Sequence, residues 1–196
     1  MKALQQLPAG YREIYSINLQ KDWKMSLLVS FLALLITAAL AVPMHFKVSV
    51  LTLFDMSGGT TAYYIRTGTM LALLFLYMIF HEAVHGIAMK ICGTKKVKYG
   101  FTGLYAYTAS DCYYSKKPYL FIALAPVVFW GVVLAAVNPF VPRSWFWVIY
   151  LIQICNLSGA AGDLLVTFKF AHMPQDILVR DYGVGMRVYS ASEVSK

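Results

Sequence analysis

The residues best suited to chemistry are His81, Glu82 and His85, which form an HExxH pattern in the segment 80–86. Two histidines four positions apart lie on one face of a helix, so both can bind one Zn²⁺, and the glutamate between them can act as a base toward an attacking water. The pattern lies inside an apolar stretch long enough to span a bilayer. Charged and metal-binding side chains are costly at membrane depth and are usually kept there for function. The sequence therefore predicts a catalytic zinc site.

Composition indicates an integral membrane protein. Of the 196 residues, 59% are hydrophobic and 13% are charged, whereas a soluble domain carries about 25% charged residues. The net charge is +8, but the positive residues flank apolar segments and form no dense run, so we expect no nucleic-acid partner. The three cysteines show no paired spacing, and no disulfide framework is expected.

Four apolar stretches predict an all-α membrane bundle of about four transmembrane helices. A signal peptide is disfavoured for the first stretch because its apolar run and its leader are both too long. Residues 43–68 are expected to form an external loop or a re-entrant segment. The chain is thus divided into a cytoplasmic leader (1–24), a transmembrane domain (25–171) and a cytoplasmic tail (172–196). The expected spans are residues 25–42, 69–91, 118–137 and 144–170.

The distribution of Lys and Arg predicts the orientation. The leader, the loop between the second and third spans, and the tail are rich in these residues, whereas the two opposite loops hold only Lys47, Arg66 and Arg143. Since positive residues concentrate on the cytoplasmic side, both termini are expected in the cytoplasm, with the chain in the cell membrane.

The third span contains Pro126. Proline lacks an N–H and its ring clashes with the carbonyl four residues earlier, so the helix is expected to bend there. The carbonyl of Ile122 is left without its helical donor.

Asp163 is the other strongly polar residue expected deep in a later span. It lies about 10 Å from the cytoplasmic end of the fourth span, close to the depth of roughly 12 Å expected for the HExxH. Catalytic zinc sites commonly have three protein ligands, and we therefore predict His81, His85 and Asp163 as ligands. Asn156 returns to the same helix face as Asp163, where it could stabilise an oxyanion, orient substrate backbone, or form an interhelical hydrogen bond.

Two hairpins are expected on the cytoplasmic side. Residues 97–114 alternate aromatic and polar side chains around a possible turn at 102–103, which predicts a β-hairpin between the second and third helices. Its strand edge could bind an extended substrate, although an aromatic interface belt fits equally well. In the tail, residues 177–180 and 186–189 predict a second hairpin that could cap the site, with a plain interfacial or disordered tail as the alternative.

The HEAVH within a membrane helix and the later Asn156 and Asp163 resemble the site-2 class of intramembrane metalloproteases. The chain is more closely similar to small bacterial proteins described as putative membrane zincin peptidases, from about residue 70 to the tail and including the stretch 124–126. In site-2 proteases a glycine typically follows the third-ligand aspartate, whereas here Leu164 follows Asp163 and Gly162 precedes it. The resemblance implies peptide-bond hydrolysis and supports the HExxH more directly than it supports Asp163.

The resulting hypothesis is a zinc-dependent, membrane-embedded endopeptidase that cleaves membrane-associated protein or peptide substrates near the cytoplasmic face, with Glu82 as general base. The alternative is a non-catalytic, zinc-bound membrane scaffold or regulator. A metal-ion transporter is disfavoured because the outer half of the membrane lacks a polar pathway. The sequence indicates no oligomeric state.

Overall fold

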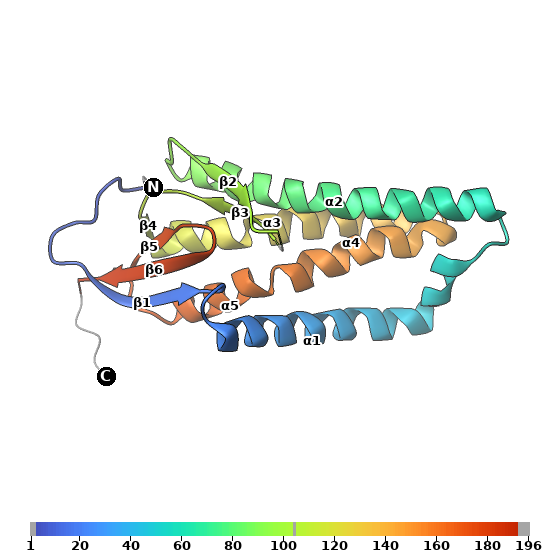
Figure 1. Ribbon diagram of the computed structural model, residues 1–196, viewed down its shortest axis with the longest axis horizontal. Helices are drawn as coiled ribbons and strands as arrows, with labels where there is room; N and C mark the ends of the chain where they lie inside the picture. The colour runs from blue at the N-terminus through green and yellow to red at the C-terminus, as the bar shows by residue number, and fades with distance from the viewer. Residues whose placement is uncertain (1–2, 104, 192–196) are drawn as a thin grey trace. The chain divides into compact units, whose positions relative to one another are not determined.

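The computed structural model describes residues 3–103 and 105–191, and its elements are drawn in Figure 1. Within these residues four helical segments are long and apolar enough to cross a membrane, which matches the predicted number of spans and indicates a membrane protein. These segments are Trp23–Lys47, Thr60–Ile91, Lys116–Phe140 and Arg143–Ala171. The helices are α1 (Trp23–Lys47), α2 (Thr60–Ile91), α3 (Lys116–Val137), α4 (Phe146–Gly159) and α5 (Ala161–Ala171).

The fourth span is two helices, contrary to the single helix expected. Helix α4 ends at Gly159, and Ala160 has a non-helical ψ of 15° before α5 begins. Gly159 and Gly162 flank the pair Ala160 and Ala161. They weaken the continuity of the helix, because glycine loses more conformational entropy than other residues when it becomes helical. As a result Asp163 lies in the first turn of α5, where a carboxylate is favoured by the helix dipole.

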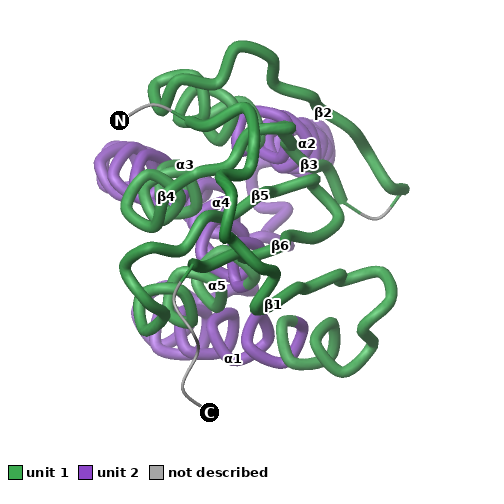
Figure 2. The backbone as a smooth tube through the Cα atoms, turned by 90° about the vertical axis from the view of Figure 1, so that its left-hand side faces the viewer, with its two compact units in different colours: residues 1–29, 82–126, 162–196 green, residues 30–81, 127–161 purple. Residues whose placement is uncertain are grey.

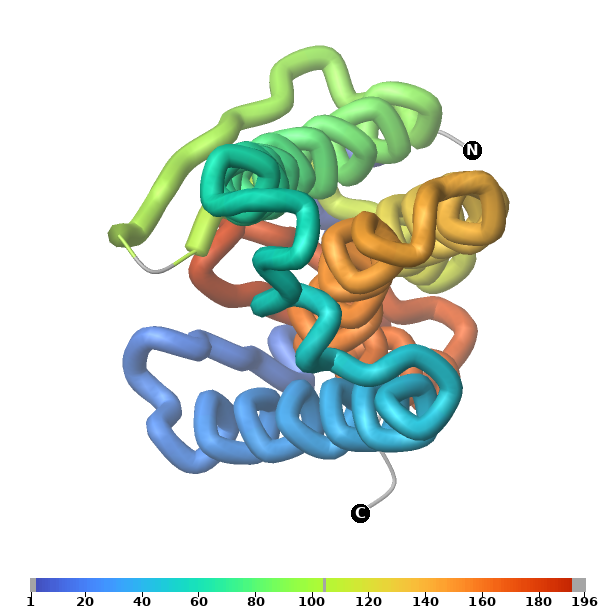
Figure 3. The backbone as a smooth tube through the Cα atoms, turned by 90° about the vertical axis from the view of Figure 1, so that its right-hand side faces the viewer, coloured from blue at the N-terminus to red at the C-terminus, as the bar shows by residue number. Residues whose placement is uncertain are grey.

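The segment expected as an external loop is largely helical. Helix α1 continues through Pro43 to Lys47, and α2 begins at Thr60, nine residues before the expected start of the second span. Figure 3 shows the connection between α1 and α2, which holds the short 3-10 helix η1 (Val50–Phe54). Two further 3-10 helices, η2 (Asn138–Phe140) and η3 (Arg143–Trp145), join α3 to α4.

The description as all-α is incomplete, because the chain also forms two antiparallel sheets. The predicted hairpins are confirmed: β2 (Lys98–Phe101) pairs with β3 (Ala106–Ala109), and β5 (Leu178–Asp181) pairs with β6 (Gly185–Ser190). The second hairpin belongs to a four-stranded sheet in the order β1-β6-β5-β4. Its outer strands, β1 (Arg12–Asn18) and β4 (Tyr114–Ser115), were not expected. Leader and tail therefore share one sheet.

Backbone packing divides the chain into two compact units, coloured separately in Figure 2. The first unit comprises residues 1–29, 82–126 and 162–196. It contains both sheets, the end of α2, the start of α3 and all but the first residue of α5. Buried side chains from each of these helical segments and from the four-stranded sheet form one core, including Met89, Ile122, Phe170, Val179 and Val188. The HExxH glutamate and its second histidine are thus held by a packed α/β core.

The second unit comprises residues 30–81 and 127–161. Here polar tips of large side chains bond to backbone carbonyls: the indole N–H of Trp147 donates to Val48, and the hydroxyl of Tyr150 donates to Leu40. Such bonds satisfy polar groups that hydrocarbon cannot solvate. These two bonds connect α4 to α1 and to Val48, the residue that follows α1.

Candidate metal centre

Helix α2 carries the HExxH without interruption, since Thr60–Ile91 contains no proline. Glu82 and His85 lie in the first unit, and His81 precedes Glu82 by one peptide bond in the same helix. The helical repeat therefore places the two imidazoles one turn apart on one face. This local geometry is the one that the spacing predicted.

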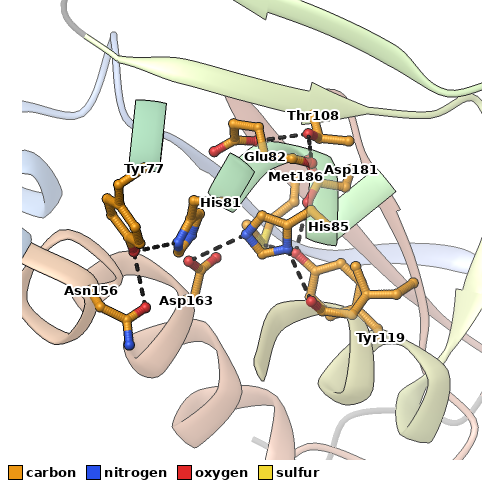
Figure 4. Close-up of polar contacts among 11 residues, drawn as sticks. Tyr77, His81, Glu82, His85, Thr108, Tyr119, Asn156, Asp163, Asp181 and Met186 are labelled. Carbon is orange, nitrogen blue, oxygen red and sulfur yellow. Dashed lines mark hydrogen bonds and ion pairs between the residues drawn. The ribbon is translucent and has the colours of Figure 1, made fainter. Parts of the chain in front are cut away.

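Two contacts orient the His85 ring, as Figure 4 shows. Its Nδ1 lies 3.0 Å from the carbonyl oxygen of Ile122, and its Nε2 lies 3.6 Å from a carboxylate oxygen of Asp163. A carbonyl only accepts hydrogen bonds, so Nδ1 must carry the proton in the first contact. His85 is buried, and Nε2 is the nitrogen that faces the carboxylate.

The structure brings His81, His85 and Asp163 together. One nitrogen of each histidine and one oxygen of the aspartate lie within 4.8 Å of one another. Tetrahedral zinc with bonds of about 2.0–2.1 Å separates its ligand atoms by about 3.4 Å, close to the 3.6 Å between His85 and Asp163. Two imidazoles and a carboxylate are also donors that zinc accepts in catalytic sites. The donor set therefore fits this ion.

Glu82 is tied to the first hairpin. The hydroxyl of Thr108, in β3, lies 2.7 Å from the Glu82 carboxylate and 2.9 Å from its backbone carbonyl oxygen. Thr108 is itself buried. A hydroxyl has one proton to donate, and the shorter contact is to the carboxylate, so strand β3 holds the side chain of the HExxH glutamate.

His81 contacts a chain of polar groups in the second unit. The Tyr77 hydroxyl donates to the side-chain oxygen of Asn156 at 2.9 Å and lies 2.7 Å from Nδ1 of His81. Because the hydroxyl proton is used toward Asn156, its oxygen accepts from His81, which places a proton on Nδ1. The side-chain nitrogen of Asn156 donates to the carbonyl of Val127 at 3.0 Å. The amide of Asn156, expected to contact substrate or another helix, is fully buried and bonds at both ends to protein groups.

Another carboxylate, that of Asp181, lies close to this cluster (Figure 4). Asp181, at the end of β5, accepts hydrogen bonds from the Tyr119 hydroxyl and from the backbone N–H of Gly183, both at 2.9 Å. Burial raises the pKa of Asp181 to about 6, an effect that these two hydrogen bonds oppose. Asp181 can therefore change its protonation state near neutral pH.

A further acidic residue, Asp111, links the two sheets. Asp111 forms ion pairs with Lys98 of β2 at 2.6 Å and with Arg180 of β5 at 3.2 Å. Hydrogen bonds from these two cations lower the pKa of Asp111. Although exposed ion pairs stabilise a protein little, this one connects the first hairpin to the strand that carries Asp181.

Sequence reasoning missed four residues around the cluster: Tyr77, Thr108, Tyr119 and Asp181. Tyr77 precedes His81 by one helical turn, so the spacing that identified the histidines could have identified it as well. Thr108, Tyr119 and Asp181 reach the site through sheet formation and packing, and no local signal marks them.

Comparisons with known proteins agree with this chemistry. The profile of a protein family described as "Putative zincin peptidase" matches residues 74–178, more than half of the chain. The chain is 32% identical over 119 residues to a protein of Pyrococcus woesei described as "Uncharacterized 24.7 kDa protein in gap 5'region". The match covers 58% of this chain and 51% of the relative, so the chain spans about half the length of that relative. No solved structure matches the chain.

Proposed function

Since this chain belongs to the family described as "Putative zincin peptidase", we propose that it is a zinc-dependent endopeptidase embedded in the membrane. The observation that carries the proposal is the approach of His81, His85 and Asp163 to within 4.8 Å at their ligand atoms, with Glu82 in the same helical turn. We assign the first three as zinc ligands and Glu82 as the general base.

The chain's own residues perform the proton transfers. Zinc bound by the three ligands would polarise the scissile carbonyl and the attacking water. Glu82 takes the proton from that water and later delivers it to the nitrogen of the leaving amine. Thr108 holds the Glu82 carboxylate in place. We assign Asn156 to the support of Tyr77, and through it of His81, since both ends of its amide are already bonded.

The proposed substrate is a membrane-associated protein or peptide presented in extended form. Helical peptide bonds are closed to attack, so a substrate must unwind near the base. The sheet of β2 and β3 contains only these two strands within the described residues, and strand addition to such a sheet would extend a peptide. Because β3 contacts Glu82 through Thr108, a strand added to this sheet would be delivered near the base.

We place the protein in the cell membrane with both termini in the cytoplasm, following the Lys and Arg distribution. Cleavage would then occur near the cytoplasmic face, because the HExxH lies in the last turns of α2 before Ile91 and precedes the Lys-rich loop.

A Glu82→Gln variant tests the proposal. It should retain zinc and the fold, trap substrates in membranes that mass spectrometry can identify, and fail to cleave them after purification, while the wild type cleaves them. Glu13→Gln is the matched control, because Glu13 lies in the first unit on the four-stranded sheet, where it pairs with the exposed Arg187. If Glu82→Gln supports the same cellular function as the wild type, the protein acts as a non-catalytic, zinc-bound scaffold or regulator and the peptidase proposal is wrong.

A further inference from the structure

The hydrogen-bond acceptor that orients His85 is unusual, because it is a backbone carbonyl inside a helix. Carbonyl groups inside an α-helix normally accept from the backbone N–H four residues later, yet the Ile122 carbonyl, inside α3, lies 3.0 Å from the imidazole Nδ1 of His85. The residue four positions after Ile122 is Pro126, which has no N–H and whose ring excludes the usual closure of the helix toward that carbonyl. The proline therefore makes this carbonyl available to a side chain.

We infer that Pro126 is a positioning residue of the metal centre. By removing the helical donor of Ile122, it provides the acceptor that keeps the proton of His85 on Nδ1. A neutral imidazole has one donor and one acceptor nitrogen, so the lone pair remains on Nε2, which faces Asp163 at 3.6 Å. Groups that hold the second nitrogen of a ligating histidine fix its tautomer and raise its affinity for the metal. The inference rests on the proposed zinc site.

Burial is consistent with this role. Pro126 is fully buried, and Ile122 and His85 are buried as well, so water does not compete readily for the carbonyl. The chain offers a contrasting proline, Pro43, which lies inside α1 and is exposed. Pro43 has the same effect on its own helix but belongs to the second unit, whereas His85, Ile122 and Pro126 belong to the first.

The experiment compares Pro126→Ala with Pro43→Ala in the full chain. Alanine at position 126 supplies a backbone N–H that can donate to the Ile122 carbonyl. The helix can then close, which draws the Ile122 carbonyl away from His85. The zinc dissociation constant, measured by competition with a chromophoric chelator, should rise at least tenfold in Pro126→Ala and stay within twofold of wild type in Pro43→Ala. Equal zinc affinity in Pro126→Ala and wild type overturns the inference, as does an equal loss in both variants.

A second measurement needs no zinc. In metal-free protein labelled with ¹⁵N-histidine, the Nδ1 proton of His85 should exchange slowly with solvent, and this protection should be lost in Pro126→Ala. A fast-exchanging Nδ1 proton in the wild type overturns the inference. A wild type that binds no zinc would refute the proposed function but not the role of Pro126 in holding His85. Failure of the proposed function and failure of this inference are therefore distinguishable.

Discussion

Replacement of Tyr77 by phenylalanine tests how the first histidine is held. The substitution removes one hydroxyl that lies 2.7 Å from Nδ1 of His81 and donates to Asn156 at 2.9 Å. Loss of such a partner typically weakens metal affinity 10–100-fold, which corresponds to about 1.4–2.7 kcal/mol. The buried oxygen of Asn156 also loses its donor, at a cost of about 1–3 kcal/mol in folding stability.

Two assays separate these effects. Chelator competition reports zinc affinity, and thermal unfolding of the metal-free protein reports stability. Tyr64→Phe is the matched control, since Tyr64 lies in the same helix and is 66% exposed.

A double variant, Tyr77→Phe with Asn156→Leu, replaces both members of the Tyr77–Asn156 hydrogen bond by apolar groups of similar shape, which can be nearly neutral for stability. The Val127 carbonyl also loses the Asn156 donor, but it lies inside α3, where the backbone N–H four residues later is its usual donor. It should therefore recover much of the lost stability, whereas zinc affinity should remain low because His81 is still unsupported. If Tyr77→Phe binds zinc as tightly as the wild type, the hydroxyl does not orient His81 and the reasoning is wrong.

Three further predictions concern other contacts of the site. Asp163→Ala should lose most bound zinc by elemental analysis, and full retention would remove Asp163 from the ligand set. In Gly86→Ala the new methyl group would overlap the hydroxyl and ring of Tyr99 in β2, so cleavage should fall while the zinc content stays unchanged. Adding Tyr99→Ala should restore cleavage, and normal cleavage in the single variant would contradict this prediction. Burial raises the pKa of Asp181 from 3.8 to about 6, so its contribution to stability is present below pH 4 and is lost as pH rises through 6, by at most about 3 kcal/mol. Metal-free Asp181→Asn should accordingly unfold with a flatter dependence on pH between 4 and 7 than the wild type, and an unchanged slope would count against the argument.

Local sequence patterns were sufficient to predict the number of spans and the first two site residues. His81 and His85 share a face because four residues make about one helical turn, and apolar length alone identified four spans. The same local reasoning failed at the break near Ala160, where propensity differences of about 1 kcal/mol per glycine are too small to separate a helix end from a continuous span.

The two sheets show a second limit of prediction from local sequence patterns, which is the pairing of distant strands. Hairpins β2–β3 and β5–β6 connect strands that are neighbours in sequence, so alternation and turn residues predicted them. Strand β1 pairs with β6 across about the whole chain, for example Arg12 with Ser190. No local signal specifies such a partner, because pairing depends on packing that forms only when the rest of the fold is present.

The sequence by itself determined a membrane protein with an HExxH helix and a proline that deprives Ile122 of its helical donor, because each follows from residue type and short spacing. Only the tertiary structure decided which groups use those features. It set the Ile122 carbonyl against His85, the Tyr77 hydroxyl against Asn156, and Asp163 within reach of both histidines. The physical reason is that hydrogen bonds and ligand distances depend on packing to within tenths of an ångström, and that packing joins segments far apart in the chain.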